Sequence, residues 1–260
     1  MRARQELEPQ PYFELQAAFG FTKHTGGLNA TKELIELCHI DKGKYVLEVG
    51  CGVGKTSNYI AENQGSRMVG VDISEKMIAR SKTNAKRKGV EKRTEFRVAD
   101  VQDLPFEDAT FDAVIGESVT AFPQDKQRTV SEYVRVTKPE GYVGLNETTW
   151  VKAPPPELAE YFSRLSGAKP ETSDGWKELL EGSGLTDIVA RTYKISALDQ
   201  WINEIRGLDI TDYLGAWFRF LSLLIKSPAC RRWAREALSM PKSIFKIFEC
   251  MGYGIYVGRK

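Results

Sequence analysis

The stretch Tyr45-Val46-Leu47-Glu48-Val49-Gly50-Cys51-Gly52-Val53-Gly54-Lys55-Thr56 decides the fold. It begins with four apolar positions around one acid and continues into a turn with three glycines at alternate positions. Residues 56–63 follow with a helical pattern. A buried parallel strand that ends at a helix N-terminus has this form. Because glycine has no Cβ, such a turn allows the backbone to lie close to a ligand.

Three kinds of ligand site use a glycine-rich turn of this kind, and residue spacing separates them. A phosphate-binding loop follows G-x-x-x-x-G-K-[ST], but the chain carries Val49 where the first glycine belongs. The dinucleotide pattern G-x-G-x-x-G requires glycine at position 55, where Lys55 stands. The pattern that remains is E-x-G-x-G-x-G, from Glu48 to Gly54.

This pattern resembles the first motif of the class I S-adenosylmethionine (SAM)-dependent methyltransferases. Further patterns typical of the family follow in its order: Asp72 after a strand at 67–71, the runs A-D-V-Q-D-L-P-F and F-D-A-V-I within 99–115, and K-P-x-G at 138–141. A nicotinamide-binding module would share Asp72, but it would not be expected to have the two runs within 99–115. The resemblance covers about residues 28–195 and the last strand. It implies SAM as cofactor and S-adenosylhomocysteine as product.

The resemblance also implies where each part of the cofactor binds. Asp72 lies twenty residues after Gly52, where a carboxylate can accept from both ribose hydroxyls. Asp100 matches the acid that accepts from the adenine amino group, and Val101 would pack on the ring. Strand-end acids such as Asp72 can also simply cap the next turn. The residues expected to contact the cofactor are Glu48, Gly50, Cys51, Gly52, Gly54, Asp72, Ile73, Met77, Asp100, Val101 and Glu117.

The fold that this resemblance implies is an α/β, Rossmann-like, doubly wound sheet of seven strands. The last strand is expected to be antiparallel, and a helical cap is inserted between strands six and seven. We expect strands at 45–49, 67–71, 94–98, 111–116, 142–147, 187–195 and 254–258. The chain then divides into an N-terminal helical segment that closes the cofactor site (1–43), the SAM-binding domain (44–196), the insert (197–252) and the last strand (253–260).

The insert has a helical pattern and is rich in apolar residues. Its helix at 210–225 is apolar except for one narrow stripe, so we expect it to be covered on two sides. A basic helix at 228–238 follows, and a third is expected from Pro241 to a stop at Gly252. Residues 213–260 carry nine Lys and Arg against two acids, while the whole chain has a net charge of +2. The insert is interpreted as a solvated cap, as a wall of the substrate pocket or as a peripheral membrane contact.

Catalysis by methyl transfer needs a general base only when the acceptor arrives protonated. The candidates, in falling order, are His24, Glu117 and Glu147, although their spacing shows no diagnostic pattern. The aromatic residues among the first forty could contact the acceptor, or they could simply pack their segment onto the sheet. The residues expected around the acceptor are Tyr12, Phe21, Asn146 and Trp217.

The chain has four cysteines and two histidines, and their spacing is not that of a metal site. Reduced cysteines suit a cytoplasmic protein, and the N-terminus lacks the apolar core of a signal peptide. The apolar stretch 213–225 is too short to span a membrane and contains Arg219. A cytoplasmic localisation without a bound metal is therefore expected.

The leading hypothesis is a SAM-dependent methyltransferase of a small-molecule acceptor, similar to the quinone and small-amine methylating group. One alternative is a methyltransferase of a lipid or quinone at the membrane surface, and another is a non-catalytic SAM-binding protein. Nucleic acid is a poor fit as a substrate, because base-methylating class I enzymes often carry N/D-P-P-[YFW] after strand four. This chain has Gly116-Glu117-Ser118-Val119 there. The acceptor atom and the oligomeric state stay open.

Overall fold

The computed structural model describes residues 24–194, 210–239 and 246–260. Its strands are β1 (Tyr45–Val49), β2 (Arg67–Asp72), β3 (Thr94–Val98), β4 (Phe111–Glu117), β5 (Thr137–Trp150), β6 (Glu171–Thr172), β7 (Thr186–Lys194) and β8 (Met251–Arg259). Its helices are α2 (Gly27–Leu37), α3 (Lys55–Asn63), α4 (Glu75–Lys88), α5 (Lys126–Val136), α6 (Pro156–Ser166), α7 (Ser173–Gly182), α9 (Ile210–Lys226), α10 (Pro228–Leu238) and α11 (Ile247–Cys250).

The strands form one sheet in the order β3-β2-β1-β4-β5-β8-β7. β8 runs antiparallel to both β5 and β7, while β1 to β5 pair in parallel. The predicted Rossmann-like sheet with an antiparallel last strand is therefore confirmed. An eighth strand, β6, pairs with the end of β5. It was not predicted, because two residues are too few to show a strand pattern.

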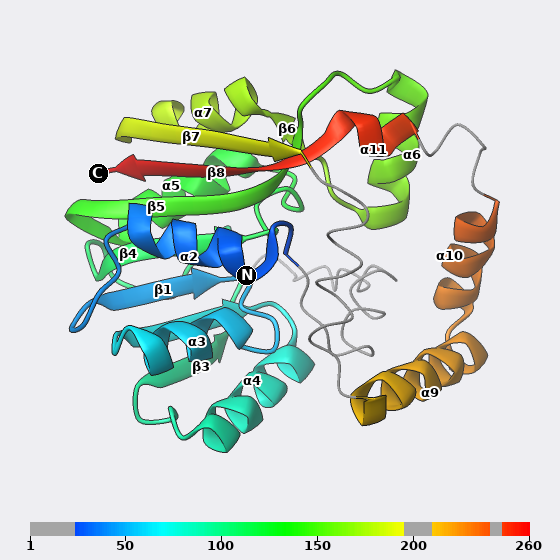
Figure 1. Cartoon of the computed structure of the whole chain (residues 1–260), viewed down its shortest axis with the longest axis horizontal. Helices are drawn as coiled ribbons and strands as arrows, with labels where there is room; N and C mark the ends of the chain where they lie inside the picture. The colour runs from blue at the N-terminus through cyan, green and yellow to red at the C-terminus, as the bar shows by residue number, and fades with distance from the viewer. Residues whose placement is uncertain (1–23, 195–209, 240–245) are drawn as a thin grey trace, which may run out of the picture.

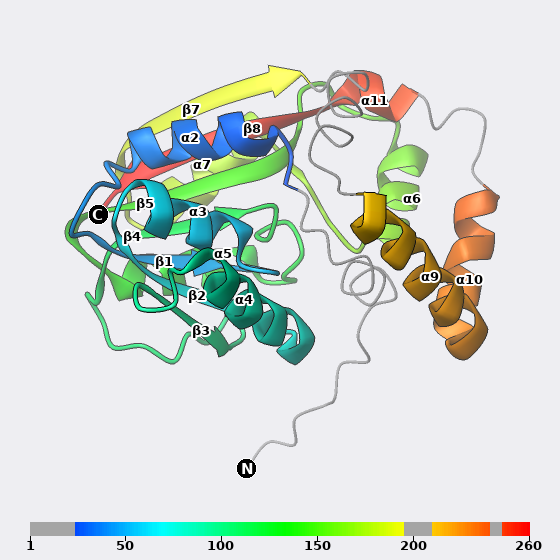
Figure 2. The same ribbon diagram turned by 60° about the horizontal axis from the view of Figure 1, so that its bottom comes forward.

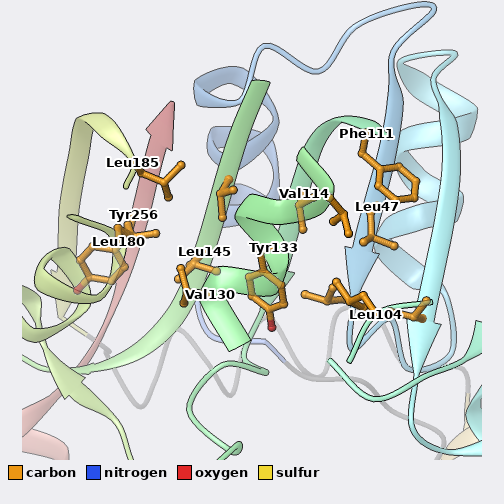
Figure 3. Packing of buried hydrophobic residues seen from close by; sticks show 14 of the residues in the cluster. Leu47, Leu104, Phe111, Val114, Val130, Tyr133, Leu145, Leu180, Leu185 and Tyr256 are labelled. Carbon is orange, nitrogen blue, oxygen red and sulfur yellow. The ribbon is translucent and has the colours of Figure 1, made fainter. Parts of the chain in front are cut away.

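Helices cover the sheet on both faces, which gives three layers (Figure 1). α2, α3 and α4 lie on one face, and α5 and α7 lie on the other. Successive strand residues point to opposite faces. Leu47 therefore belongs to the core cluster that includes Val130 and Tyr133 of α5 (Figure 3), whereas Val46 belongs to the cluster that includes Leu34 of α2 and Ile60 of α3.

The carboxyl ends of the parallel strands meet at one edge of the sheet. Val49 of β1 is level with Val71 of β2 and with Gly116 of β4. Glu117 is in turn level with Asn146 of β5. This register gathers the glycine turn, the end of β2 and the end of β4 at the edge where ligands bind in open parallel sheets.

The predicted end of the third insert helix, at Gly252, is wrong. α11 ends at Cys250, and Gly252 lies within β8, opposite Thr149 of β5 and Lys194 of β7. A Cβ on Gly252 would lie 2.2 Å from the carbonyl oxygen of Tyr193, so glycine is needed there for close strand approach. The expected helix start at Pro241 lies outside the described residues.

The helices α9 and α10 lie beyond the edge at which β1 ends, and Figures 1 and 2 agree on this arrangement. The indole nitrogen of Trp233 in α10 donates to the carbonyl of Leu165 in α6 at 2.8 Å. The expectation that α9 is covered on two sides is wrong for its described side chains, because Phe218 and Ile225 are 77% and 78% exposed. Among the described residues, no helix has both the length and the apolar character needed to cross a membrane.

Candidate active site

Three residues of the glycine turn after β1 have a left-handed backbone conformation. Gly50, Gly52 and Gly54 have φ values of 63°, 51° and 74°, which side chains with a Cβ rarely adopt. A Cβ on Gly50 would also lie 2.5 Å from Cγ2 of Val119. The Cys51 side chain is buried under the turn. Both the backbone angles and the close packing therefore require glycine here.

Glu48 lies beneath this turn and not on its surface. Its carboxylate accepts from the backbone N–H of Ser57 at 2.8 Å and from the Ser57 hydroxyl, so it holds the first turn of α3 against β1. Burial raises the pKa of Glu48 to about 8, with a smaller contribution from the negative charge of Glu117. These contacts show that Glu48 supports the turn, and its expected contact with the cofactor stays a prediction.

Asp72 connects the glycine turn with the end of β2. One carboxylate oxygen accepts from the N–H of Gly52 and the other from the N–H of Ser74, both at 2.9 Å. Burial raises the pKa of Asp72, and these two amide donors oppose that shift. A carboxylate has about four acceptor positions, so roughly two remain for a ligand.

The residues after β2 and β3 differ in exposure. Ile73 is 62% exposed beside Asp72, and the exposed Asp100 stands at the turn after β3. Val101 is half-buried against the core. Met77 is buried against Val53. The ends of β2 and β3 thus present an exposed apolar side chain, Ile73, and an exposed carboxylate, Asp100.

The end of β4 carries a buried carboxylate with several donors around it. Glu117 accepts from the hydroxyl of Thr56 at 2.9 Å and from the side-chain amide of Asn146 at 3.0 Å. The hydroxyl of Thr31 on α2 lies 3.1 Å from Oε2 and 3.2 Å from Oε1. His24 Nε2 lies 3.4 Å from Oε2. The structure therefore brings together His24, Glu117 and Asn146 from the predicted set.

Thr31 stands between His24 and Glu117. Its Oγ1 lies 3.0 Å from Nε2 of His24, as well as within hydrogen-bonding distance of both Glu117 oxygens. A hydroxyl has one proton to donate, and a carboxylate only accepts. When Thr31 donates to Glu117, its oxygen can only accept from His24, so Nε2 then carries the proton. This geometry lets Thr31 orient the imidazole ring.

Glu147 does not join this cluster, because it is the next residue along β5 after Asn146 and points to the other face of the sheet. Its Oε1 accepts from the backbone N–H groups of Val119 and Thr120 at 2.9 and 2.6 Å. Burial raises the pKa of Glu147 to about 7, against the opposing effect of these donors. Its contacts hold the loop after β4.

The other predicted acceptor residues cannot be placed. Tyr12, Phe21 and the side chain of Trp217 lie outside the described residues. Sequence reasoning missed Thr31 and Thr56. Thr56 could have been found from its place directly after the glycine turn. Thr31 left no signal, since it lies 86 positions from Glu117.

Comparisons with known proteins identify a methyltransferase domain in the chain. A family model described as a methyltransferase domain matches residues 47–145. The chain is 28% identical over 208 residues to phosphoethanolamine N-methyltransferase 3 of Arabidopsis thaliana, covering 74% of this chain and 42% of that protein. It is 35% identical over 189 residues to norajmaline N-methyltransferase of Rauvolfia serpentina, covering 71% and 60%. The chain thus spans less than two thirds of either relative.

The fold also has solved counterparts. The chain superposes with a TM-score of 0.71 on a SAM-dependent methyltransferase from Geobacter sulfurreducens in complex with S-adenosyl-L-homocysteine. The two are 18% identical, and the match covers 96% of this chain and 97% of that one, which shows a shared fold. Together with the match at residues 47–145, this shows that the chain contains a methyltransferase domain with the class I, Rossmann-like fold.

Proposed function

We propose that the protein transfers the methyl group of SAM to a nitrogen atom of a small-molecule acceptor. The observation that carries the proposal is the buried carboxylate of Glu117 beside His24, at the same sheet edge as the glycine turn. A buried carboxylate suits a cationic ligand, and amine acceptors are cationic before they react. The N-methyltransferases of Arabidopsis thaliana and Rauvolfia serpentina to which the chain is similar support nitrogen as the acceptor atom.

The residues at the turn fit SAM. The unused acceptor positions of Asp72 suit the ribose hydroxyls, and the exposed Ile73 offers an apolar surface to the adenine ring. Asp100, with Val101 beside it, is proposed to accept from the adenine amino group. The buried carboxylate of Glu117 lies at the same sheet edge, so the site favours a cofactor that carries positive charge. When bound, SAM supplies a methyl group on a positively charged sulfur, and the neutral thioether is the leaving group.

The chain itself contributes alignment and a place for one proton. Displacement forms a nitrogen–carbon bond and breaks the carbon–sulfur bond, and an ammonium acceptor must first lose a proton. We assign that proton to His24. Glu117 Oε2, 3.4 Å from Nε2, stabilises the resulting imidazolium. Thr31 and Asn146 keep the carboxylate in position.

The first experiment is titration calorimetry with SAM, S-adenosylhomocysteine and NAD. Binding of the first two without NAD supports the cofactor assignment, and an absence of SAM binding refutes the proposed function. The second experiment measures release of S-adenosylhomocysteine with a panel of small primary, secondary and tertiary amines. Turnover with an amine supports the proposal, whereas SAM binding without turnover on any amine refutes nitrogen methylation.

Variants separate catalysis from binding. His24→Ala should lower kcat by about 10²–10⁴-fold, the usual contribution of a general base, while the dissociation constant for S-adenosylhomocysteine stays unchanged. Thr31→Val keeps the shape but removes the hydroxyl, and it should lower kcat less, with KM retained. Exposed Glu91, at the opposite edge of the sheet, provides the control Glu91→Gln. An unchanged kcat in His24→Ala would exclude His24 as the base.

A further inference from the structure

One face of α9 exposes a stripe of large apolar side chains. Phe218, Leu221 and Ile225 are 77%, 54% and 78% exposed. At 3.6 residues per turn these three positions fall within an arc of about 60°. Isolated apolar side chains are common on protein surfaces, but an aligned group on one helix face indicates a contact surface.

Positive charge lies beside this stripe. Arg219 and Lys226 of α9 are exposed and lie about 100° further round the helix than Phe218 and Ile225. The acid of α10, Glu236, is engaged by Arg164 of α6. The exposed arginines of α10 are Arg231, Arg232 and Arg235. The exposed face of α9 is thus apolar along one line and basic beside it, and α10 carries further exposed cations.

A cation of α4 lies near α9. Burial lowers the pKa of Arg80 in α4, and the positive charge of Arg219 in α9 adds to that effect, so the two helices place cations near each other. α4 is itself rich in exposed cations, namely Lys76, Lys82, Lys86, Arg87 and Lys88. Arg219 of α9 therefore lies near a cation of the Rossmann-like domain, Arg80.

We propose that α9 binds the surface of an anionic lipid bilayer. Phe218, Leu221 and Ile225 enter the boundary between headgroups and acyl chains, and the flanking cations contact acidic headgroups. An apolar face with Lys and Arg next to it is the pattern of helices that lie in the membrane interface. A soluble polyanion would engage the cations but would leave the apolar stripe in water. This binding is independent of the proposed function.

The test is cosedimentation of the full chain with vesicles of phosphatidylcholine, either alone or mixed with phosphatidylserine. We expect binding to the mixed vesicles at low salt and weaker binding at high salt. The triple variant F218S/L221S/I225S should lower the partition coefficient at least tenfold. R232Q/R235Q should lower it by about fivefold per charge removed. Val189→Ser on β7 and Lys42→Gln before β1 remove exposed apolar and basic side chains elsewhere, and should bind as the wild type.

All the changed side chains of α9 are exposed, so the variants are expected to fold. Titration with S-adenosylhomocysteine checks this for each variant. Wild-type protein that stays in the supernatant with mixed vesicles overturns the proposal. Binding that survives the triple variant but is lost in R232Q/R235Q also overturns it, because the contact would then be electrostatic alone. Loss in both variants, with retention in both controls, supports an interfacial helix.

Discussion

Replacing Asp72 by alanine tests the centre of the cofactor assignment. The carboxylate sits where the glycine turn and the end of β2 meet, with one oxygen on the N–H of Gly52 and the other on the N–H of Ser74. If its remaining acceptor positions hold both ribose hydroxyls, the variant loses two charge-assisted hydrogen bonds. Each contributes about 1.5–3 kcal/mol. The expected loss is about 3–6 kcal/mol, or roughly 10²–10⁴-fold in affinity.

The assay is titration calorimetry with S-adenosylhomocysteine and with an analogue that lacks both ribose hydroxyls. Wild-type protein should prefer S-adenosylhomocysteine strongly, and Asp72→Ala should lose that preference. The analogue matters because Asp72→Ala also releases the amide of Gly52 and can loosen the turn, which would weaken both ligands equally. Glu91→Gln removes an exposed carboxylate at the opposite sheet edge and should behave as the wild type. A variant that keeps the full preference refutes the ribose contact.

Two further predictions concern the turn. The pKa of Glu48 is raised from 4.5 to about 8 by burial, so the folded protein holds a proton that the unfolded chain releases. The free energy of unfolding should therefore fall between about pH 4.5 and pH 8. In Glu48→Gln the total fall over this range should be smaller by on the order of a few kcal/mol, as measured by thermal unfolding across pH. Gly50→Ala should destabilise the protein in urea by more than the 1–2 kcal/mol typical of a left-handed alanine, because its Cβ would lie 2.5 Å from Val119. Gly89→Ala, at φ 69° with open space around the Cβ, should show about that typical cost; equal losses in the two variants would contradict the crowding at Gly50.

Much of the fold was predictable because its signals are local. The turn from Gly50 to Gly54 requires left-handed backbone at three positions, and the sequence has glycine at each of them. β3 was predicted with its observed bounds, since 94–98 is a short run between clear breaks. The expected helix stop at Gly252 failed, because glycine there serves a neighbouring strand and not a helix end. The cofactor contacts of this turn stay predictions.

The sequence alone determined the Rossmann-like sheet, the glycine turn and the placing of Asp72 and Glu117 at strand ends, because each follows from residues close together in the chain. Only the tertiary structure decided which carboxylates act together. Glu147 was a candidate base until the alternation of β5 directed it to the opposite face, and Thr31 joined Glu117 only because α2 packs across that strand end. The exposed face of α9 was decided in the same way. A pattern of apolar residues specifies a helix and its faces, but what covers each face depends on packing between distant segments.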